Sequence, residues 1–382
     1  MSKTRVAFLL PGLGRVQRGA ETAFLEVARE LNRFDDFEVE LFGSGHNVPQ
    51  GIPIHAVPCI SREVFEKWPK LPALRTDCHY EEMTFVSNLA WGRMFKPHHF
   101  NVAIACSYPY VNWFLQRTAR LYGLRQIFVT QNGDWMCHAS SREYRFFGCD
   151  GLVCINPQYF EQHRNRYRTA LIPNGVDPSE YCPSQEDAGD SYDPVLESIP
   201  NDRPVVLMVS ALIPSKRVAE GIQVVAEVPD AFLVVAGDGP ERNAVGALAK
   251  RLLPNRHFFV GSLSRHNMPQ LYRRANVFLH MSQIEPFGIV YLEAASTGLP
   301  IVASDTPVTR WLLGDSGMLV DSSNIESVAE GLKTVLRSPA GQELGASGRI
   351  RVLREWTWEV QAARYRDFIF EMLAERPCAP SV

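Results

Sequence analysis

Two glutamates eight residues apart, Glu285 and Glu293, lie in the segment MSQIEPFGIVYLEAASTGLP (281–300) and could bind an elongated anion that carries hydroxyl groups. An apolar run precedes them, and Pro286 and Gly288 suit the start of a helix. Glu285 then lies just before the helix, and Glu293 about 12 Å farther along its axis. The first-turn N–H groups between them lack partners within the helix and attract negative charge. The spacing therefore predicts an anion site with a carboxylate at each end.

A nucleotide sugar has this layout of charge and hydroxyl groups. Its diphosphate would rest on the first-turn amides of Ile289 and Val290. Glu285 would accept hydrogen bonds from hydroxyl groups at one end of the ligand, and Glu293 from those at the other end. A second interpretation remains open on spacing alone, in which Glu293 is a surface residue and Glu285 an ordinary carboxylate at a helix start.

Two adjacent cations, Lys216 and Arg217, follow an apolar run in the sequence VSALIPSKRV (209–218). On a loop between a strand and a helix they could neutralise a diphosphate, at ~1 kcal/mol or more for each charge-assisted contact. A solvated pair of charges on an exposed loop explains the same residues.

A glycine-rich loop, PGLGRVQRGAE (11–21), separates the first apolar run from the first helical pattern. Gln17 breaks the G-x-G-x-x-G pattern, which argues against an NAD-dependent enzyme, and no G-x-x-x-x-G-K-[ST] occurs, which excludes a P-loop NTPase. Backbone N–H groups near Gly19 could still approach an anion. A tight turn between a strand and a helix is the alternative.

Short apolar runs alternate with helical patterns along the whole chain, which predicts α/β structure with parallel sheets covered by helices on both faces. We expect strands at 5–10, 37–43, 52–58, 102–107, 125–130, 151–156, 204–210, 232–237, 257–262, 276–281 and 300–304. We expect helices at 19–34, 217–228, 240–253, 266–274, 287–298 and 356–375.

Two successive sets of such units predict two doubly wound, Rossmann-like domains with a ligand cleft between them. The first would span 1–178, and the second 204–356. An acidic, proline-containing stretch at 179–203 would link them. A terminal helix at about 357–382 would pack back on the first domain.

The composition is that of a globular protein, with 46% apolar and 21% charged residues and a formal charge of 39 − 42 = −3. This charge argues against a nucleic-acid partner. No apolar stretch reaches 18 residues, and the first apolar run is too short for a secretory leader. Eight cysteines form no C-x-x-C pair, so we expect reduced thiols in a cytoplasmic protein. The basic and aromatic cluster WGRMFKPHH (91–99) is either a peripheral contact with membrane lipid or an ordinary helix end.

With its two glutamates, EPFGIVYLE (285–293) resembles the E-x7-E motif of the GT4 family of retaining glycosyltransferases, which have the GT-B fold. Further segments resemble that family in the expected order and cover most of the second half of the chain. They are RGAE (18–21), IPNGVD (172–177), the loop with Lys216, VVAGDGPE (234–241), VGSLSRHNMPQLYRRANVFLHMS (260–282) and GLPIVASD (298–305).

The resemblance implies roles for these residues in binding a nucleoside-diphosphate sugar. Lys216 would stabilise the leaving phosphate, Glu285 would hold the hydroxyl groups of the sugar, and Glu293 those of the ribose. Ala211 replaces an arginine that is common in the family, and Arg217 is the candidate substitute. The base would contact the backbone near Gly239 and Leu263. The full set of other donor-binding residues is Gly19, Arg217, Gly239, Leu263, Phe287, Gly288, Ile289, Val290 and Glu293.

The resemblance further implies a hexosyl transfer with retention at the anomeric carbon. No D-x-D sequence is present, so we expect neither a metal nor another cofactor. The acceptor would be a small molecule, a glycan or a lipid-linked compound bound to the first domain, with Asp134 and His138 as candidate contacts. Two alternatives are a protein that binds a nucleotide sugar without transferring it and an epimerase on the same fold.

Overall fold

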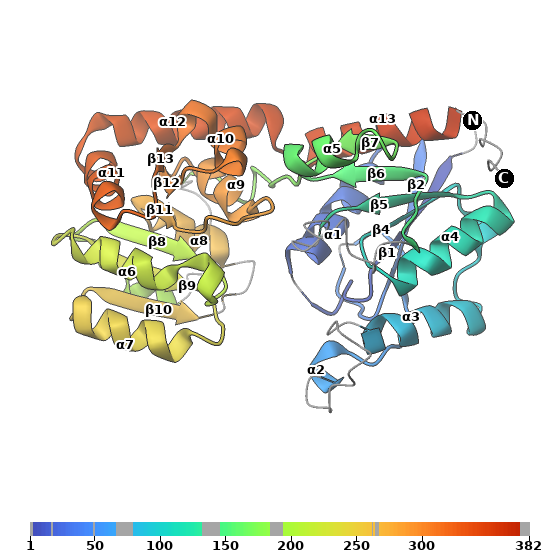
Figure 1. Cartoon of the computed structure of the whole chain (residues 1–382), viewed down its shortest axis with the longest axis horizontal. Helices are drawn as coiled ribbons and strands as arrows, with labels where there is room; N and C mark the ends of the chain where they lie inside the picture. The colour runs from blue at the N-terminus through green and yellow to red at the C-terminus, as the bar shows by residue number, and fades with distance from the viewer. Residues whose placement is uncertain are drawn as a thin grey trace. The chain divides into compact units, whose positions relative to one another are not determined.

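The computed structural model describes residues 3–16, 18–48, 50–65, 79–131, 146–183, 194–261, 263 and 267–374. The chain divides into two compact units (Figure 1). Unit 1 consists of residues 1–174 and 358–382, and unit 2 of residues 175–357. Unit 1 is therefore discontinuous in the sequence.

Unit 1 is built on a parallel seven-stranded sheet in the order β3-β2-β1-β4-β5-β6-β7. The central strands are apolar and buried on both faces, as parallel strands covered by helices are. The order reverses between β1 and β4, where Val6 pairs with Val39 on one side and Val102 on the other. The strands are β1 (Thr4–Leu9), β2 (Phe37–Gly43), β3 (Ile54–Ala56), β4 (Val102–Ala105), β5 (Arg125–Val129), β6 (Gly151–Cys154) and β7 (Thr169–Leu171).

The helices of unit 1 lie on both sides of this sheet (Figure 1). They are α1 (Gly19–Leu31), α2 (Arg62–Phe65), α3 (His79–Trp91), α4 (Tyr110–Tyr122), α5 (Pro157–His163) and α13 (Trp358–Ala374), with a 3₁₀ turn η1 (Pro97–His99). Helix α13 packs against α1. Its Phe370 ring lies 5.3 Å from that of Phe37 at the start of β2, and Ile369 is fully buried. The last helix of the chain thus completes the core of its first domain.

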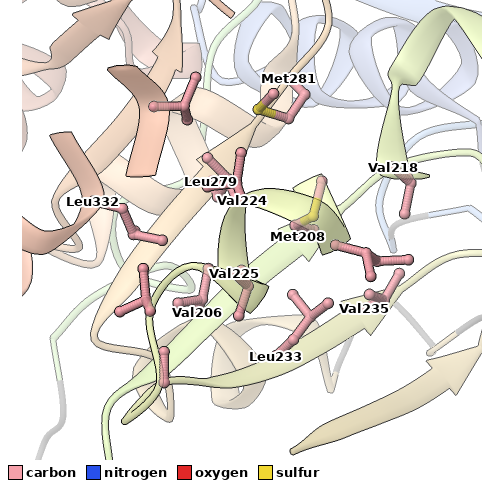
Figure 2. Packing of buried hydrophobic residues seen from close by; sticks show 14 of the residues in the cluster. Val206, Met208, Val218, Val224, Val225, Leu233, Val235, Leu279, Met281 and Leu332 are labelled. Carbon is pink, nitrogen blue, oxygen red and sulfur yellow. The ribbon is translucent and has the colours of Figure 1, made fainter. Parts of the chain in front are cut away.

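Unit 2 has a parallel six-stranded sheet in the order β10-β9-β8-β11-β12-β13. Its strands are β8 (Val205–Val209), β9 (Phe232–Ala236), β10 (His257–Gly261), β11 (Val277–His280), β12 (Ile301–Ser304) and β13 (Met318–Val320). Figure 2 shows its core, where Met208, Leu233 and Leu279 project from the sheet into one apolar cluster with Val225. The order of the strands reverses between β8 and β11.

Helices cover the sheet of unit 2. They are α6 (Val218–Ala226), α7 (Arg242–Leu252), α8 (Met268–Arg273), α9 (Ile289–Ser296), α10 (Pro307–Leu313), α11 (Ile325–Arg337) and α12 (Pro339–Glu355), with 3₁₀ turns η3 (Pro194–Ser198), η4 (Pro214–Lys216) and η5 (Gly314–Ser316). Both sheets therefore follow the 3-2-1-4-5-6 order of doubly wound nucleotide-binding folds, with one further strand in unit 1. No helix within the described ranges is both long enough and apolar enough to cross a bilayer.

The stretch 179–203, which we predicted to be a linker, differs from that expectation in its described residues. Unit 2 begins at Gly175 and includes this stretch. Tyr181 is buried, and its carbonyl accepts a hydrogen bond from the Ser296 hydroxyl at 2.5 Å. Leu196 and Ile199 are buried as well. These apolar residues do not recur at the spacing of a strand or a helix, and acidic residues surround them. Their burial could therefore not be predicted from the sequence.

Buried carboxyl groups lie at the carboxyl edge of the sheet of unit 1. Glu82, in the first turn of α3, accepts a hydrogen bond from the N–H of Tyr110 at 3.3 Å and is almost fully buried. Burial raises the pKa of Glu82 from 4.5 to about 8, and the charge of Glu81 adds to this. Glu82 is therefore protonated in the folded protein near neutral pH, but ionised in the unfolded chain.

This difference gives a testable dependence of stability on pH. Between pH 4.5 and about 8 the folded protein holds a proton that the unfolded chain lacks, so the free energy of unfolding falls as the pH rises. The Glu82 contribution is greatest below pH 4.5 and falls by roughly 1 kcal/mol per pH unit. We expect Glu82→Gln, which keeps a carbonyl acceptor, to flatten this part of the profile in urea unfolding from pH 5 to 8. The exposed Glu359→Gln should leave it unchanged, and an equal slope in Glu82→Gln would refute the assignment.

Candidate functional site

The site predicted from the sequence assembles at the carboxyl ends of β8 and β11 in unit 2. These two strands are adjacent, and the order of the sheet reverses between them. In open α/β sheets this reversal is where ligands bind, because the following loops run to opposite sides. Lys216 lies on the turn η4 after β8, and Glu285 on the loop after β11. The topology therefore brings together residues that are 69 positions apart.

Lys216 and Glu285 form an ion pair between Nζ and Oε2, and both side chains are largely buried, with 19% and 11% of their surface exposed. Ser282 stabilises this arrangement. Its hydroxyl lies 3.2 Å from the carbonyl of Ser215 and 3.0 Å from that of Ile284, so it connects the two loops. The pair predicted to serve a phosphate and a sugar is thus preassembled, with each charge neutralising the other.

His280 and Tyr291 belong to the same site, although no sequence pattern singled them out. His280 ends β11 and is 3% exposed. Its Nδ1 lies 3.1 Å from the Tyr291 hydroxyl and accepts a hydrogen bond from the N–H of Ser282 at 3.4 Å. Its Nε2 lies 4.0 Å from Oε2 of Glu285. Burial, followed by the charge of Lys216, lowers the pKa of His280 from 6.5 to about 3, so the ring is neutral.

Helix α9 begins at Ile289, and the turn before it depends on Gly288. The φ of Gly288 is +82°, a conformation that residues with a Cβ rarely adopt. This turn places the N–H groups of Ile289 and Val290 in the first turn of the helix, where an α-helix offers no internal acceptors. Phe287 is buried, with its ring 6.1 Å from that of Trp311 and 6.3 Å from that of Trp356. Its side chain anchors the loop, so only its backbone can serve a ligand.

Glu293 lies one turn into α9 and is half-buried. Its Oε2 accepts a hydrogen bond from the hydroxyl of Tyr272 on α8 at 2.7 Å. Burial, followed by the charge of Glu293, raises the pKa of Tyr272 well above its usual range, so the phenol stays protonated and donates. Tyr272 thereby fixes the orientation of the carboxylate. A single aromatic residue on a helix resembles a core residue, which is why the sequence did not identify it.

Arg217, the second predicted cation, has a different environment from Lys216. Its Nε donates to Glu220 at 2.8 Å, and its Nη1 to the hydroxyl of Ser322 at 3.3 Å. It joins η4 to α6 and has a φ of +54°. Arg217 is therefore near Lys216 in the chain but is already paired with a carboxylate.

The remaining predicted residues have less defined surroundings. Gly239 lies beside the loop after β8, where the N–H of Leu212 donates to the carbonyl of Asp238 at 3.0 Å. Leu263 is half-buried after β10. Gly19 is the first residue of α1 in unit 1. Asp134 and His138 lie outside the described residues. Within the described ranges, no group of three or more His, Cys, Asp or Glu side chains is placed to hold a metal ion.

Comparison with known proteins places part of unit 2 within a known family. Residues 195–349, which include every predicted site residue of unit 2, match the family described as glycosyl transferases group 1. A relative from Corynebacterium glutamicum, a GDP-mannose-dependent monoacylated alpha-(1-6)-phosphatidylinositol monomannoside mannosyltransferase, is 29% identical over 278 residues. The alignment covers 66% of this chain and 72% of the relative.

Two solved structures resemble the whole chain. Sucrose-phosphate synthase from Thermosynechococcus elongatus superimposes with a TM-score of 0.77 at 18% identity and covers 97% of this chain and 100% of that one. Anabaena HepE in complex with UDP and glucose gives a TM-score of 0.72 at 18% identity, over 96% and 99% of the two chains. At these identities the likeness establishes the fold, which is that of two doubly wound α/β units.

Proposed function

We propose that this chain, a glycosyltransferase with the GT-B fold, moves a hexose from a nucleoside-diphosphate sugar to an acceptor hydroxyl with retention of configuration and without a metal. The observation that carries the proposal is the Lys216–Glu285 pair beside the start of α9. This arrangement supplies a cation and backbone donors for a diphosphate, together with carboxylates for hydroxyl groups.

Each group of the donor has a matching partner in this proposal. The diphosphate takes the N–H groups of Ile289 and Val290 and the ammonium of Lys216. Lys216 leaves Glu285 to do so, and Glu285 then accepts hydrogen bonds from the sugar. Glu293, oriented by Tyr272, accepts them from the ribose. The predicted contributions of Gly19, Gly239 and Leu263 remain part of the proposal.

The transfer breaks the bond between the anomeric carbon and the phosphate oxygen and forms a bond to the acceptor oxygen on the same face of the sugar. The acceptor hydroxyl loses its proton to the departing phosphate oxygen. Lys216 and the amides of α9 stabilise the negative charge that develops on the diphosphate. No carboxylate acts as a nucleophile, in contrast to retaining glycoside hydrolases.

A panel of donors tests this proposal directly. Thermal shift with UDP-glucose, GDP-mannose, ADP-glucose and TDP-glucose should identify one nucleotide whose sugar conjugate stabilises the protein. Nucleotide release should then require an acceptor, and EDTA should leave the rate unchanged. Binding of a donor without nucleotide release for any acceptor would indicate a binding protein, and conversion of the bound sugar to its epimer would indicate an epimerase. Failure of every donor to bind would refute the proposal.

We further propose that the acceptor is lipid-linked and that unit 1 contacts an anionic membrane through one face of α4. The exposed side chains Trp113, Arg117, Arg120 and Leu121 recur at helical spacing, and the Phe146 ring packs on Trp113 at 6.4 Å. These residues line a groove of about 900 Å³. From residue 83 to 133 the sequence contains no Asp or Glu. Exposed aromatic and apolar side chains beside arginines that pair with no carboxylate in the described part of the chain are complementary to an anionic lipid surface.

Vesicle sedimentation tests this contact. The full chain should bind vesicles of phosphatidylcholine with 30% phosphatidylglycerol and not vesicles of phosphatidylcholine alone, with each arginine contributing about 1 kcal/mol. The double variant Arg117→Gln/Arg120→Gln should lose this binding. Lys250→Gln/Arg251→Gln, which removes two exposed cations from α7 of unit 2, is the matched control. Equal losses in both variants would mean that net charge, and not the α4 face, governs binding.

A further inference from the structure

We infer that His280 is a positioning residue for Glu285, whose carboxylate it holds through Nε2–H when Lys216 turns to the phosphates of the donor. The inference rests on the proposed function, because it concerns the same site during donor binding. His280 itself touches neither phosphate nor sugar in this scheme. It acts only through the orientation of Glu285.

The hydrogen bonds of His280 determine which ring nitrogen carries the proton. The N–H of Ser282 can only donate, and it points at Nδ1 from 3.4 Å. Nδ1 must therefore present its lone pair, and the Tyr291 hydroxyl, 3.1 Å away, can donate to it as well. A neutral imidazole with an unprotonated Nδ1 carries its proton on Nε2. Nε2, the nitrogen that carries this proton, lies 4.0 Å from Oε2 of Glu285.

The neutrality of the ring suits this role. The ring is 3% exposed, and the ammonium of Lys216 lies nearby, so both burial and like charge keep a second proton off His280. Among the described residues, the titratable groups of Tyr291 and Glu285 also lie near the ring. Burial, and after it the charge of Glu285, raises the pKa of Tyr291 well above its usual range. A neutral ring donates one hydrogen bond to the carboxylate without competing with Lys216 for the phosphates.

Donor binding creates the need for such a residue. In the structure without ligand, Lys216 neutralises Glu285. Once the ammonium pairs with the diphosphate, the largely buried carboxylate of Glu285 has no cationic partner left among the described residues. Only neutral hydrogen-bond donors can then stabilise its charge. A carboxylate left without donors at such a position is costly and changes its orientation. A shift of about 1 Å would bring Nε2 and Oε2 into the range of a charge-assisted hydrogen bond.

The backbone explains why this residue lies where it does. His280 is the last residue of β11, so the sheet fixes its Cα, and Ser282, which donates to its ring, also connects the loop of Glu285 to η4. Tyr291 on α9 contacts the same ring, with 5.0 Å between the ring centroids. The strand, the loop and the helix that form the site therefore all converge on one imidazole.

Three substitutions of His280 distinguish the role of Nε2 from that of Nδ1. His280→Gln can place an amide N–H where Nε2 is, whereas His280→Asn reaches only as far as Nδ1 and cannot serve Glu285. His280→Phe keeps the ring volume and removes both polar atoms. The matched control is His257→Phe, at another histidine of unit 2, whose Nδ1 lies 2.8 Å from the carbonyl oxygen of Leu253.

The readout is the ratio of two affinities, measured by calorimetry for the nucleotide that the donor panel selects. The probes are UDP and UDP-glucose, or GDP and GDP-mannose. We expect His280→Asn and His280→Phe to weaken binding of the nucleotide sugar about tenfold, with binding of the bare diphosphate unchanged and kcat lowered. His280→Gln should restore most of the preference for the sugar conjugate, and His257→Phe should match the wild type.

The outcomes distinguish this inference from the proposed function. If the wild type binds no nucleotide, the proposed function itself fails. If it binds both probes and His280→Asn keeps the wild-type ratio, the positioning role is refuted while the function stands. An equal loss of affinity for both probes would also refute it, because loss of a merely structural residue would weaken the binding of both. Should His280→Phe not fold, the comparison of Asn with Gln decides the question.

Discussion

Turnover should fall by at least about a hundredfold when Lys216 is replaced by alanine, because removal of one donor to a developing oxyanion typically costs this much. The ammonium of Lys216 pairs with Glu285 just before the start of α9, and the lysine side chain is largely shielded from water. Its charge is therefore worth more here than on the surface. Steady-state nucleotide release with the best donor and acceptor is the measurement.

Two further variants make this result interpretable. Lys216→Arg should recover little activity, since a planar guanidinium does not replace a compact ammonium on a buried loop. Lys250→Ala removes an exposed lysine of α7 and should leave turnover unchanged. Circular dichroism and urea unfolding should show that Lys216→Ala is folded. Near-normal turnover of folded Lys216→Ala would remove this residue from the chemistry.

Replacing Gly288 by valine should abolish measurable binding of the nucleotide sugar and destabilise unit 2. The φ of +82° costs a residue with a Cβ about 1–2 kcal/mol, and a β-branched residue more. A Cβ at this position would also lie 2.7 Å from two ring carbons of Tyr291 and 3.0 Å from Cγ of Glu285. The loop must therefore move, and both the carboxylate and the first-turn amides of α9 move with it.

A second glycine provides the control for this substitution. Gly246 lies on α7, and a Cβ there would meet no other atom within 4 Å. Gly246→Val should therefore bind the donor like the wild type, with a melting temperature close to it. Calorimetric titration of the donor and thermal unfolding measure both effects. Wild-type affinity in Gly288→Val would show that the turn before α9 does not position the site.

Much of the fold follows from short apolar runs that alternate with helical patterns. The central strands are recognisable because both of their faces are buried, as in FLVVA of β9. The strands β7 and β13 were missed, since each has only three residues, all half-buried at a sheet edge. Helix α3 was missed for another reason: its buried face combines Phe85 and Leu89 with Glu81 and Glu82, so it shows no apolar stripe.

The candidate site divides in a similar way. Lys216 and Glu285 were identifiable, because charged residues directly after apolar strands meet at one edge of a parallel sheet. His280, Tyr272 and Tyr291 were not, because each is a buried aromatic side chain that in the sequence resembles a core residue. Only their partners reveal a role, and partners depend on tertiary structure. The pairing of Arg217 with Glu220 was likewise invisible, although the two are three residues apart.

The discontinuity of unit 1 has a consequence for the order of events on the ribosome. Residues 175–357 emerge as one continuous stretch and hold everything that unit 2 requires. The first 174 residues emerge earlier but lack α13, whose Ile369 and Phe370 complete the packing near α1 and β2. The domain whose synthesis begins first must therefore wait, with apolar surface uncovered, until residues 358–374 have followed the whole of the second domain.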